Sequence, residues 1–355
     1  MLCKLILLLT AASWVYWLVA WRMVHVFFRD YAASGEDFTP PVSLLKPVKG
    51  LDPEAYENFA SFCRQDYPAY EILFGVADPD DPCVPVVERL RQEFPERGIK
   101  LVVAPALGAN RKASILHTLA GRAAHEILVI SDSDIRVAPD YLRRVVAPLA
   151  DAATGLVTCP YRGEQPRTFT ARLEALYMGT TFLPSVMIAR RALAMRFAMG
   201  ATTVLRRSDL ERIGGFAALA DYLADDYQLG YRISGLDLRV HLSDCVVASI
   251  LGATTFGEQW RRELRWMRCN RVSRPWGYPG LLLSFCTPLA LALFLLGGGW
   301  AALAVSVFLR WEVAWQVAGY TGDREARAWL AWLPLRDMLS ALVWIAGAFG
   351  LRVSW

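Results

Sequence analysis

The chain carries its longest apolar segments at its two ends, and this arrangement limits its possible folds more than any other feature. Leu5 to Trp21 contains no charged residue and is flanked by Lys4 and Arg22. A helix needs about 20 mostly apolar residues to cross a bilayer, so residues 1–30 are predicted to form a transmembrane anchor. A cleaved signal peptide is the alternative, but the run is long, no small-residue cleavage site follows it, and its Trp residues suit a membrane interface.

The second apolar end, residues 277–355, is predicted to hold about two or three further transmembrane helices. The candidate spans are Gly280–Leu296, Trp300–Gly319 and Pro334–Val353, with residues 321–332 as an amphipathic interface helix between the last two. A single long tilted helix from Leu281 to Leu309 is an alternative to the first two spans. Arg310 and Glu312 would lie near the end of the second span, where they are expected to pair with each other or reach the interface.

Residues 40–276 form the third predicted part, a soluble catalytic domain that holds most of the charged residues. The net charge of +4 is too small to indicate a nucleic-acid partner. Six arginines precede the C-terminal helices: Arg261, Arg262, Arg265, Arg268, Arg271 and Arg274. Basic residues beside a span mark its cytoplasmic side, so we expect an integral membrane protein whose catalytic domain faces the cytoplasm. The cysteines and histidines are dispersed, which does not indicate zinc or disulfides, and the oligomeric state stays unknown.

Short apolar strands alternate with helical stretches in the soluble part. Strands are expected at residues 42–45, 71–77, 100–103 and 126–130, and helices at 56–64, 84–94 and 111–124. This order predicts an α/β fold, a mostly parallel sheet flanked by helices. In such sheets ligands bind just beyond the carboxyl ends of the strands.

Two acidic turns follow predicted strands and indicate a site for a nucleotide-activated sugar. Asp132 and Asp134 could hold a divalent cation, Mn²⁺ or Mg²⁺, together with the oxygens of the sugar diphosphate. Asp78 is expected to accept a hydrogen bond from the nucleobase, and Asp81 to serve the ribose or the metal region. A solvated turn is the alternative for either pair taken alone, but two such turns after strands favour the site.

Two further elements suit the same chemistry. Asn110 and Lys112 open a predicted helix, and a helix N-terminus with a nearby lysine favours the phosphates of a donor. Asp225 and Asp226 are adjacent carboxylates that raise each other's pKa, as a general base for a hydroxyl acceptor requires. Each has an ordinary alternative, a solvated helix start for the first and a cap or salt bridge for the second.

A basic helix and an apolar, Met-rich segment supply the remaining candidate residues. Arg262 and Arg265 are three positions apart, so they share a helix face and could grip a departing diphosphate, with Trp266 as a lid. A membrane-interface helix is the alternative, and both roles are compatible. Acceptor lipid is expected at Tyr177, Met178, Phe182 and Met187, within a Met-rich stretch that could equally be core packing.

With these residues in view, the chain resembles the ceramide glucosyltransferase family, whose members are nucleotide-sugar-dependent transferases with the GT-A fold. The similar segments lie at residues 42–47, 49–53, 78–82, 132–137, 173–180, 214–216, 225–227 and 262–266. That family is described by three separated aspartates followed by a (Q/R)xxRW element, which map onto Asp81, Asp132, Asp226, Arg262, Arg265 and Trp266. Four ordered motifs are far more specific than any one of them.

The resemblance implies an inverting transfer of a hexose, with glucose favoured, from a UDP-sugar to the hydroxyl of ceramide, giving a β-linked glycolipid. It assigns Asp81 and Asp132 to donor and metal binding and Asp226 to the catalytic base. Two positions depart from animal members, some of which have Gly at Asp134, and which carry His where this chain has Thr158. Identical acceptor handling is therefore not implied.

Three other functions remain to be weighed. A bacterial branch of similar proteins uses UDP-N-acetylglucosamine and a hopanoid acceptor, and residues 61–68 suit that branch as well. A processive polysaccharide synthase also combines acidic motifs with a QxxRW element, but the few predicted spans leave little room for a polymer pore. A non-catalytic scaffold that only binds nucleotide sugar would not need the full set of carboxylates.

Overall fold

The computed structural model of the protein describes residues 1–31 and 37–350. The chain divides into two compact units, each of which is described by itself. The helical unit comprises Met1–Asp30, Arg162–Ala192 and Leu251–Trp355, and the sheet unit comprises Tyr31–Tyr161 and Leu193–Ile250. These units do not follow the three consecutive segments expected from the sequence, because two stretches of the segment 40–276 are compact with the terminal helices.

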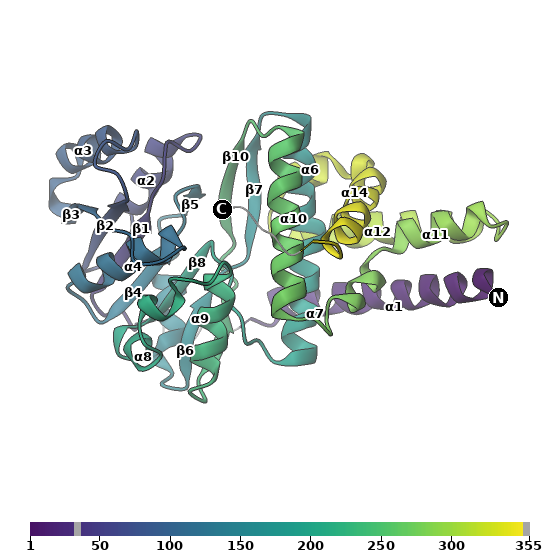
Figure 1. The fold of residues 1–355 in the computed structure, drawn as a ribbon, viewed down its shortest axis with the longest axis horizontal. Coiled ribbons are helices and arrows are strands. Elements are labelled where there is room, and N and C mark those ends of the chain that lie inside the picture. The colour runs from purple at the N-terminus through teal and green to yellow at the C-terminus, as the bar shows by residue number, and fades with distance from the viewer. Residues whose placement is uncertain (32–36, 351–355) are drawn as a thin grey trace. The chain divides into compact units, whose positions relative to one another are not determined.

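The sheet unit is built on a seven-stranded sheet in the order β3-β2-β1-β4-β8-β6-β9 (Figure 1). Its strands are β1 (Val42–Pro47), β2 (Tyr70–Val76), β3 (Ile99–Val103), β4 (Ile127–Ser131), β6 (Thr154–Thr158), β8 (Thr202–Arg206) and β9 (Arg239–Leu242). Neighbouring strands run parallel except at β8, which is antiparallel to both β4 and β6. The chain leaves this unit after β6 and re-enters it before β8, so no short crossover helix forces β8 into the parallel direction.

Helices surround this sheet, as the alternating pattern predicts. They are α2 (Ala55–Cys63), α3 (Val84–Glu93), α4 (Arg111–Arg122), α5 (Tyr141–Val146), α8 (Arg207–Arg212) and α9 (Asp225–Ser234). Every residue of β1 and β4 is buried, which is the pattern of strands covered on both faces. A short strand β5 (Ile135–Arg136) follows the second acidic turn and pairs antiparallel with β10 (Val247–Gly252). The predicted mostly parallel sheet flanked by helices is confirmed.

The helical unit contains eight helices in the part that the structure describes. They are α1 (Leu2–Arg29), α6 (Phe169–Tyr177), α7 (Leu183–Leu193), α10 (Phe256–Ser273), α11 (Cys286–Leu295), α12 (Ala301–Tyr320), α13 (Arg324–Ala328) and α14 (Leu333–Gly347), and β7 (Tyr161–Pro166) leads into α6. Three stretches are long and apolar enough to cross a membrane: Leu2–Arg29, Ala301–Tyr320 and Leu330–Gly347. The predicted N-terminal and C-terminal transmembrane helices are confirmed on this measure.

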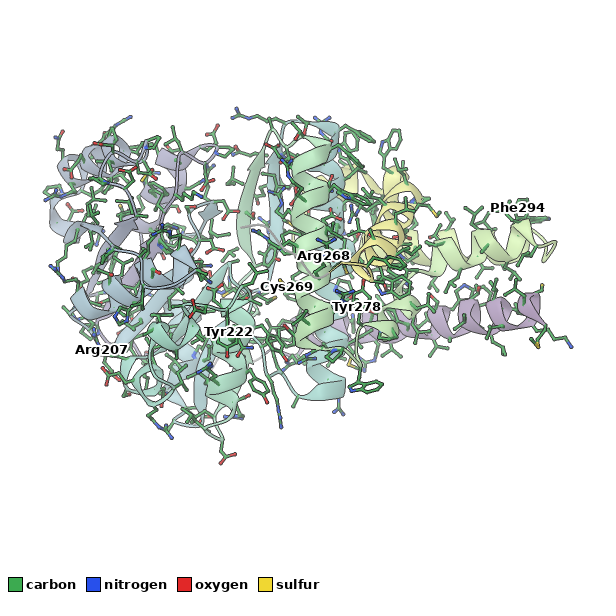
Figure 2. The ribbon with its side chains drawn as sticks, viewed as in Figure 1. Arg207, Tyr222, Arg268, Cys269, Tyr278 and Phe294 are labelled. Carbon is green, nitrogen blue, oxygen red and sulfur yellow. The ribbon has the colours of Figure 1, made fainter. Side chains whose placement is uncertain are left out.

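The first predicted C-terminal span has a different structure. Residues Pro279–Ser284 form a 3-10 helix, and the α-helix that follows, α11, has only 10 residues. The alternative of one long helix from Leu281 to Leu309 is wrong, because Gly297 and Gly299 adopt φ angles of 82° and 78° and break the chain between α11 and α12. The α11 helix lies beside α1, and its exposed Phe294 points away from α1 (Figure 2). An apolar side chain on the outer surface suits contact with lipid.

Other boundaries shift as well. The expected interface helix over residues 321–332 consists of α13 and a 3-10 turn at Leu330–Trp332. The last predicted span ends at Gly347, and its final three residues lie outside the described residues.

A buried ion pair joins α12 to α14. Arg310 donates from Nη2 to Asp337 Oδ1 at 2.8 Å and from Nε to Asp337 Oδ2 at 3.1 Å, and Thr287 of α11 donates to the same Oδ2 at 2.7 Å. The guanidinium also lies over the Trp17 ring of α1, 3.7 Å from its centroid. The expected pairing of Arg310 with Glu312 is wrong, because Asp337 lies on the inward face of the neighbouring helix, whereas Glu312 accepts from Gln316 one turn along.

We predict that Asp337→Leu destabilises the protein by about 3–5 kcal/mol, because it leaves the Arg310 guanidinium buried without its counter-charge. The double variant Arg310→Met/Asp337→Leu should recover most of that loss, since neither charge remains. Thermal unfolding in detergent measures both, with Glu312→Gln as a control on the same helix. An Asp337→Leu melting temperature equal to that of the wild type would contradict a stabilising pair.

Candidate active site

The second acidic turn begins where β4 ends, and its first carboxylate faces α4. Asp132 forms an ion pair with Lys112 in the first turn of that helix. Burial alone would lower the pKa of Lys112. The negative charges of Asp132 and then Asp225 outweigh that effect and raise the pKa of Lys112. The predicted phosphate-binding lysine and the predicted metal-binding aspartate are therefore direct partners. The positive charge of Lys112 is held among carboxylates.

The second carboxylate of this turn has a separate partner. Asp134 accepts a hydrogen bond from Ser249 Oγ at 2.6 Å. Burial, and then the charge of Asp132, raises the pKa of Asp134 to about 6. Among residues 1–31 and 37–350, no group of three or more His, Cys, Asp or Glu side chains is placed to hold a metal ion. A cation at Asp132 and Asp134 would therefore need further ligands other than His, Cys, Asp and Glu side chains of the described residues.

The predicted catalytic pair opens helix α9. Asp226 Oδ1 accepts from the Tyr227 backbone N–H at 2.7 Å, and carboxylates in the first helical turn are favoured by the helix dipole. Burial, followed by the charge of Asp225, raises the pKa of Asp226 to about 6. Burial also raises the pKa of Asp225, although the positive charge of Lys112 opposes this rise. At neutral pH Asp226 is therefore ionised but close to its pKa, as a base requires.

Gly200, just before β8, is the point where these groups converge, and the sequence reading did not identify it. A Cβ atom at Gly200 would lie 3.3 Å from Asp226 Oδ2, 3.5 Å from Asp132 Oδ2 and 3.5 Å from Lys112 Nζ. The same small cavity is lined by Lys112, Gly200, Asp225 and Asp226. The structure thus brings the second acidic turn, the α4 lysine and the α9 carboxylates to one place. No local motif marks Gly200, so only the fold could identify it.

We predict that Gly200→Ala lowers glycosyl transfer about a hundredfold without lowering stability, because the added methyl group displaces reacting groups by a fraction of their contact distance. The melting temperature should stay level or rise slightly, since alanine reduces the entropy of the unfolded chain. Gly121→Ala is the matched control, because a Cβ there meets nothing within 4 Å. Equal activity of both variants would show that the space at Gly200 is not needed.

Lys46 of β1 is a second residue that the sequence reading passed over. Its side chain is fully buried, and Nζ donates to the backbone carbonyl of Asp132 at 2.8 Å. The ammonium also lies 3.7 Å from the centroid of the Phe62 ring. Burial lowers its pKa to about 7, although Asp134 and Asp132 oppose this. Lys46 therefore fixes the position of the second acidic turn through its hydrogen bond to the Asp132 carbonyl. Its place inside the 42–47 motif was the available signal.

The first acidic turn is organised by its own carboxylates. Asp81 accepts from the Gly50 N–H at 2.9 Å and from the Cys83 N–H at 3.0 Å. Burial alone would raise its pKa, but these backbone donors hold the pKa of Asp81 below its usual value. Asp78 is exposed and accepts from the Asp80 N–H at 3.0 Å. Asp81 thus joins the turn to the loop after β1, while Asp78 is exposed to solvent.

Asn110 is the N-cap of α4 and is buried. Its Oδ1 accepts from the Ala113 N–H at 3.0 Å, and its Nδ2 donates to the Tyr222 carbonyl at 2.8 Å. It therefore fixes the start of the helix that carries Lys112 and ties it to the loop before α9. This is the ordinary capping role, and contact with a donor phosphate stays a prediction.

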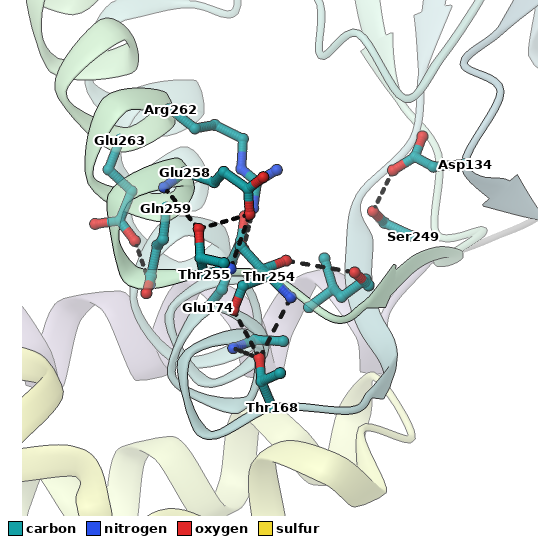
Figure 3. A network of polar contacts seen from close by, with 12 residues as sticks. Asp134, Thr168, Glu174, Ser249, Thr254, Thr255, Glu258, Gln259, Arg262 and Glu263 are labelled. Carbon is teal, nitrogen blue, oxygen red and sulfur yellow. Dashed lines mark hydrogen bonds and ion pairs between the residues drawn. The ribbon is translucent and has the colours of Figure 1, made fainter. Parts of the chain in front are cut away.

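The basic motif lies on α10 in the helical unit, whereas the carboxylates above belong to the sheet unit. Arg262 forms an ion pair with the fully buried Glu174 of α6 (Figure 3). Arg265 and Trp266 are half-buried on the same helix. The role of all three in donor binding stays a prediction.

The predicted acceptor residues follow α6 in the helical unit. Tyr177, Met178 and Met187 are buried, and Phe182 is half-buried. Met178–Phe182 forms one π-helical turn between α6 and α7, a feature frequent at functional sites. Contact of these residues with a lipid likewise stays a prediction.

Known proteins share both sequence and fold with this chain. The model of Glycosyl transferase family 21 matches residues 5–355. Ceramide glucosyltransferase 3 of Caenorhabditis elegans is 27% identical over 71% of this chain and 57% of its own length, and Ceramide glucosyltransferase 1 of the same organism is 23% identical over 66% and 51%. The chain spans about half the length of these curated relatives. The expected resemblance is confirmed.

A solved structure extends the fold likeness to the whole chain. The mannosyltransferase of Pyrobaculum calidifontis in complex with GDP-Man and Mn²⁺ superposes with a TM-score of 0.63, covers 98% of both chains and is 22% identical. This likeness concerns the fold, including the helices at both ends.

Proposed function

Because the chain belongs to Glycosyl transferase family 21, we propose that it transfers a hexose, with glucose favoured, from a UDP-sugar to the hydroxyl of a membrane lipid, most simply ceramide. The convergence of Asp132, Asp226 and Lys112 around Gly200 carries this proposal. Two carboxylates and a lysine thus lie together beyond the carboxyl end of β4, where α/β sheets bind ligands, and this arrangement supports the proposal. Relatives named ceramide glucosyltransferases support both the donor and the acceptor.

Asp226 is the proposed catalytic base of a single displacement. The lipid hydroxyl attacks C1 of the sugar and passes its proton to Asp226, while the bond from C1 to the diphosphate oxygen breaks. The configuration at C1 inverts, so the product is β-linked. The burial that raises the pKa of Asp226 to about 6 leaves it a stronger base than an exposed carboxylate, yet ionised at neutral pH.

Donor binding is assigned to the groups around the acidic turns. Asp78 would accept from the nucleobase and Asp81 would serve the ribose side, while Asn110 and Lys112 present the start of α4 to the diphosphate. Arg262, Arg265 and Trp266 are proposed to clamp the departing diphosphate. Lys46 supports the turn through its bond to the Asp132 carbonyl.

The acidic turn fits a divalent cation by its donor set. Asp132 and Asp134 offer hard oxygen ligands suited to Mn²⁺ or Mg²⁺, and a cation between them would favour the ionised form of Asp134, whose pKa is raised by burial and then by the charge of Asp132. Oxygens of the diphosphate would complete the coordination. When bound, the cation would neutralise charge that develops on the leaving group.

The membrane setting follows from the helices and the arginines. We propose that α1, α12 and α14 anchor the chain, and that the arginines between residues 261 and 274 face the cytoplasmic surface, where UDP-sugars are available. The expected catalytic domain, residues 40–276, would then work at that surface, with Tyr177, Met178, Phe182 and Met187 toward the lipid.

The proposal predicts labelled glycolipid in the organic extract when the purified protein is given UDP-glucose and ceramide with Mn²⁺. Asp226→Asn should lower this transfer by about 10²–10⁴-fold, the usual contribution of a general base. Asp66→Asn, at an exposed carboxylate, is the control. Parallel reactions with UDP-N-acetylglucosamine and a hopanoid test the alternative acceptor. A polymer product, or no product with any pair, would overturn the proposal.

The rate should also depend on pH in a direction set by Asp226. Since the base acts only when deprotonated and its pKa lies at about 6, kcat should be full above pH 7 and fall as the pH drops through about 6. An exposed aspartate would keep its activity down to about pH 4. A flat profile from pH 5 to 8 would argue against Asp226 as the base.

A further inference from the structure

Helices α6, α10 and α14 of the helical unit bury charged and amide side chains against one another. We call Glu174, Gln259, Arg262, Glu263 and Arg336 the polar cluster. Arg336 Nη2 donates to Glu263 Oε2 at 2.7 Å. Gln259 Nε2 donates to Glu263 Oε1 at 2.6 Å, and Arg262 pairs with Glu174 (Figure 3). Four of these residues are nearly inaccessible, with exposures of 3% or less, while the side chain of Arg262 is 33% exposed.

Five polar atoms of the polar cluster are buried and have no hydrogen-bond partner among the residues that the structure describes. They are Nε and Nη1 of Arg336, Nε of Arg262, Oε1 of Glu174 and Oε1 of Gln259. Buried polar atoms are almost always paired in proteins, so a single orphan is already unusual. Five of the nine such atoms among the described residues lie in this one set of contacting side chains, and this concentration points to a polar ligand there.

The chemistry of these atoms limits the ligand. Three are donors and two are acceptors, and the two glutamates and two arginines of the polar cluster cancel in formal charge. A phosphate would meet the free oxygens of Glu174 and Gln259, and an ammonium would meet the arginines. A neutral group that both donates and accepts, such as a hydroxyl or an amide, satisfies both kinds of atom.

The surroundings suit the end of a lipid. The Arg336 guanidinium lies over the Tyr177 ring, 4.6 Å from its centroid, and Met178 follows on the same segment. The polar atoms of Arg336 therefore lie beside the ring of Tyr177, which is itself one of the predicted lipid contacts. Arg262 is the outermost member by exposure, so the approach to the polar cluster lies on its side.

We propose that Glu174, Gln259 and Arg336 of the polar cluster bind the neutral headgroup of the acceptor lipid through its hydroxyl and amide groups, with Tyr177 against the adjoining apolar part, while Arg262 keeps its proposed role toward the donor diphosphate. This assignment rests on the proposed function and adds the means by which the acceptor is recognised. Neutral hydroxylated lipids would be accepted, while phosphorylated ones would be rejected by the free carboxylate oxygen of Glu174.

Gln259→Met tests the assignment, because it removes one orphan acceptor and keeps the length of the side chain. The KM for ceramide should rise by roughly fivefold, the effect of losing one neutral hydrogen bond, while the KM for UDP-glucose stays unchanged. The lipid-free melting temperature should fall modestly, because Gln259→Met also removes the donor to Glu263 Oε1, so the selective change in the ceramide KM is the deciding readout. Asn270→Ala, an exposed amide on the same helix, should change neither constant.

The outcomes separate this assignment from the proposed function. If wild-type protein forms no glycolipid, the proposed function fails. If it does, and Gln259→Met lowers the melting temperature with an unchanged ceramide KM, the amide is structural and the assignment is overturned. A parallel rise in both KM values also overturns it, because the effect would not be specific to the acceptor.

Lipid binding by the wild type provides a test that needs no variant. Ceramide in mixed micelles should raise the melting temperature in detergent, whereas ceramide 1-phosphate, which has the same chains and an anionic headgroup, should raise it less. An equal or larger shift with the phosphorylated lipid would overturn the assignment, even if Gln259→Met fails to fold.

Discussion

The ion pair between Arg310 and Asp337 determines how the helices of the helical unit meet. A charge taken out of water is costly unless an opposite charge and further hydrogen bonds meet it in good geometry. Here Asp337 receives both nitrogens of Arg310 and the hydroxyl of Thr287, while the flat guanidinium lies on Trp17. Helices α1, α11, α12 and α14 therefore contribute to one contact. Helices of purely apolar sequence can pack in several registers, whereas a bidentate ion pair favours the register in which its two partners meet.

In the sheet unit, too, buried polar groups are met by opposite charges and hydrogen-bond partners, here through two lysines instead of an arginine. Lys46 binds the Asp132 carbonyl from inside the sheet, and Lys112 pairs with the Asp132 carboxylate from α4. The acidic turn is thus held by two lysines before any donor arrives. Preorganised charge of this kind avoids the cost of reorganisation at the moment of reaction.

Much of this was accessible from the sequence, because periodicity and turn composition are local. The strands and helices from Val42 to Ile130, the anchor at the N-terminus and the order of the acidic turns follow from patterns of a few residues. The partners of Arg310 and Arg262 do not, since each lies on a helix distant in sequence. The role of Gly200 could not be predicted from the sequence for the same reason. Its importance depends on what surrounds it, and a lone glycine between apolar residues carries no pattern.

The antiparallel strand β8 has a consequence for the order in which the chain can fold. It lies between β4 and β6 in the sheet, yet it is synthesised after residues 162–192, which belong to the helical unit. The strands β1 to β4 can associate as soon as they emerge, but β6 and β9 join them only through β8. Such non-local pairing is slow, because the entropy of closing a long loop is lost before the stabilising strand contacts form. The part of the sheet against which α9, the helix that carries Asp226, packs is therefore completed late in the synthesis of the chain.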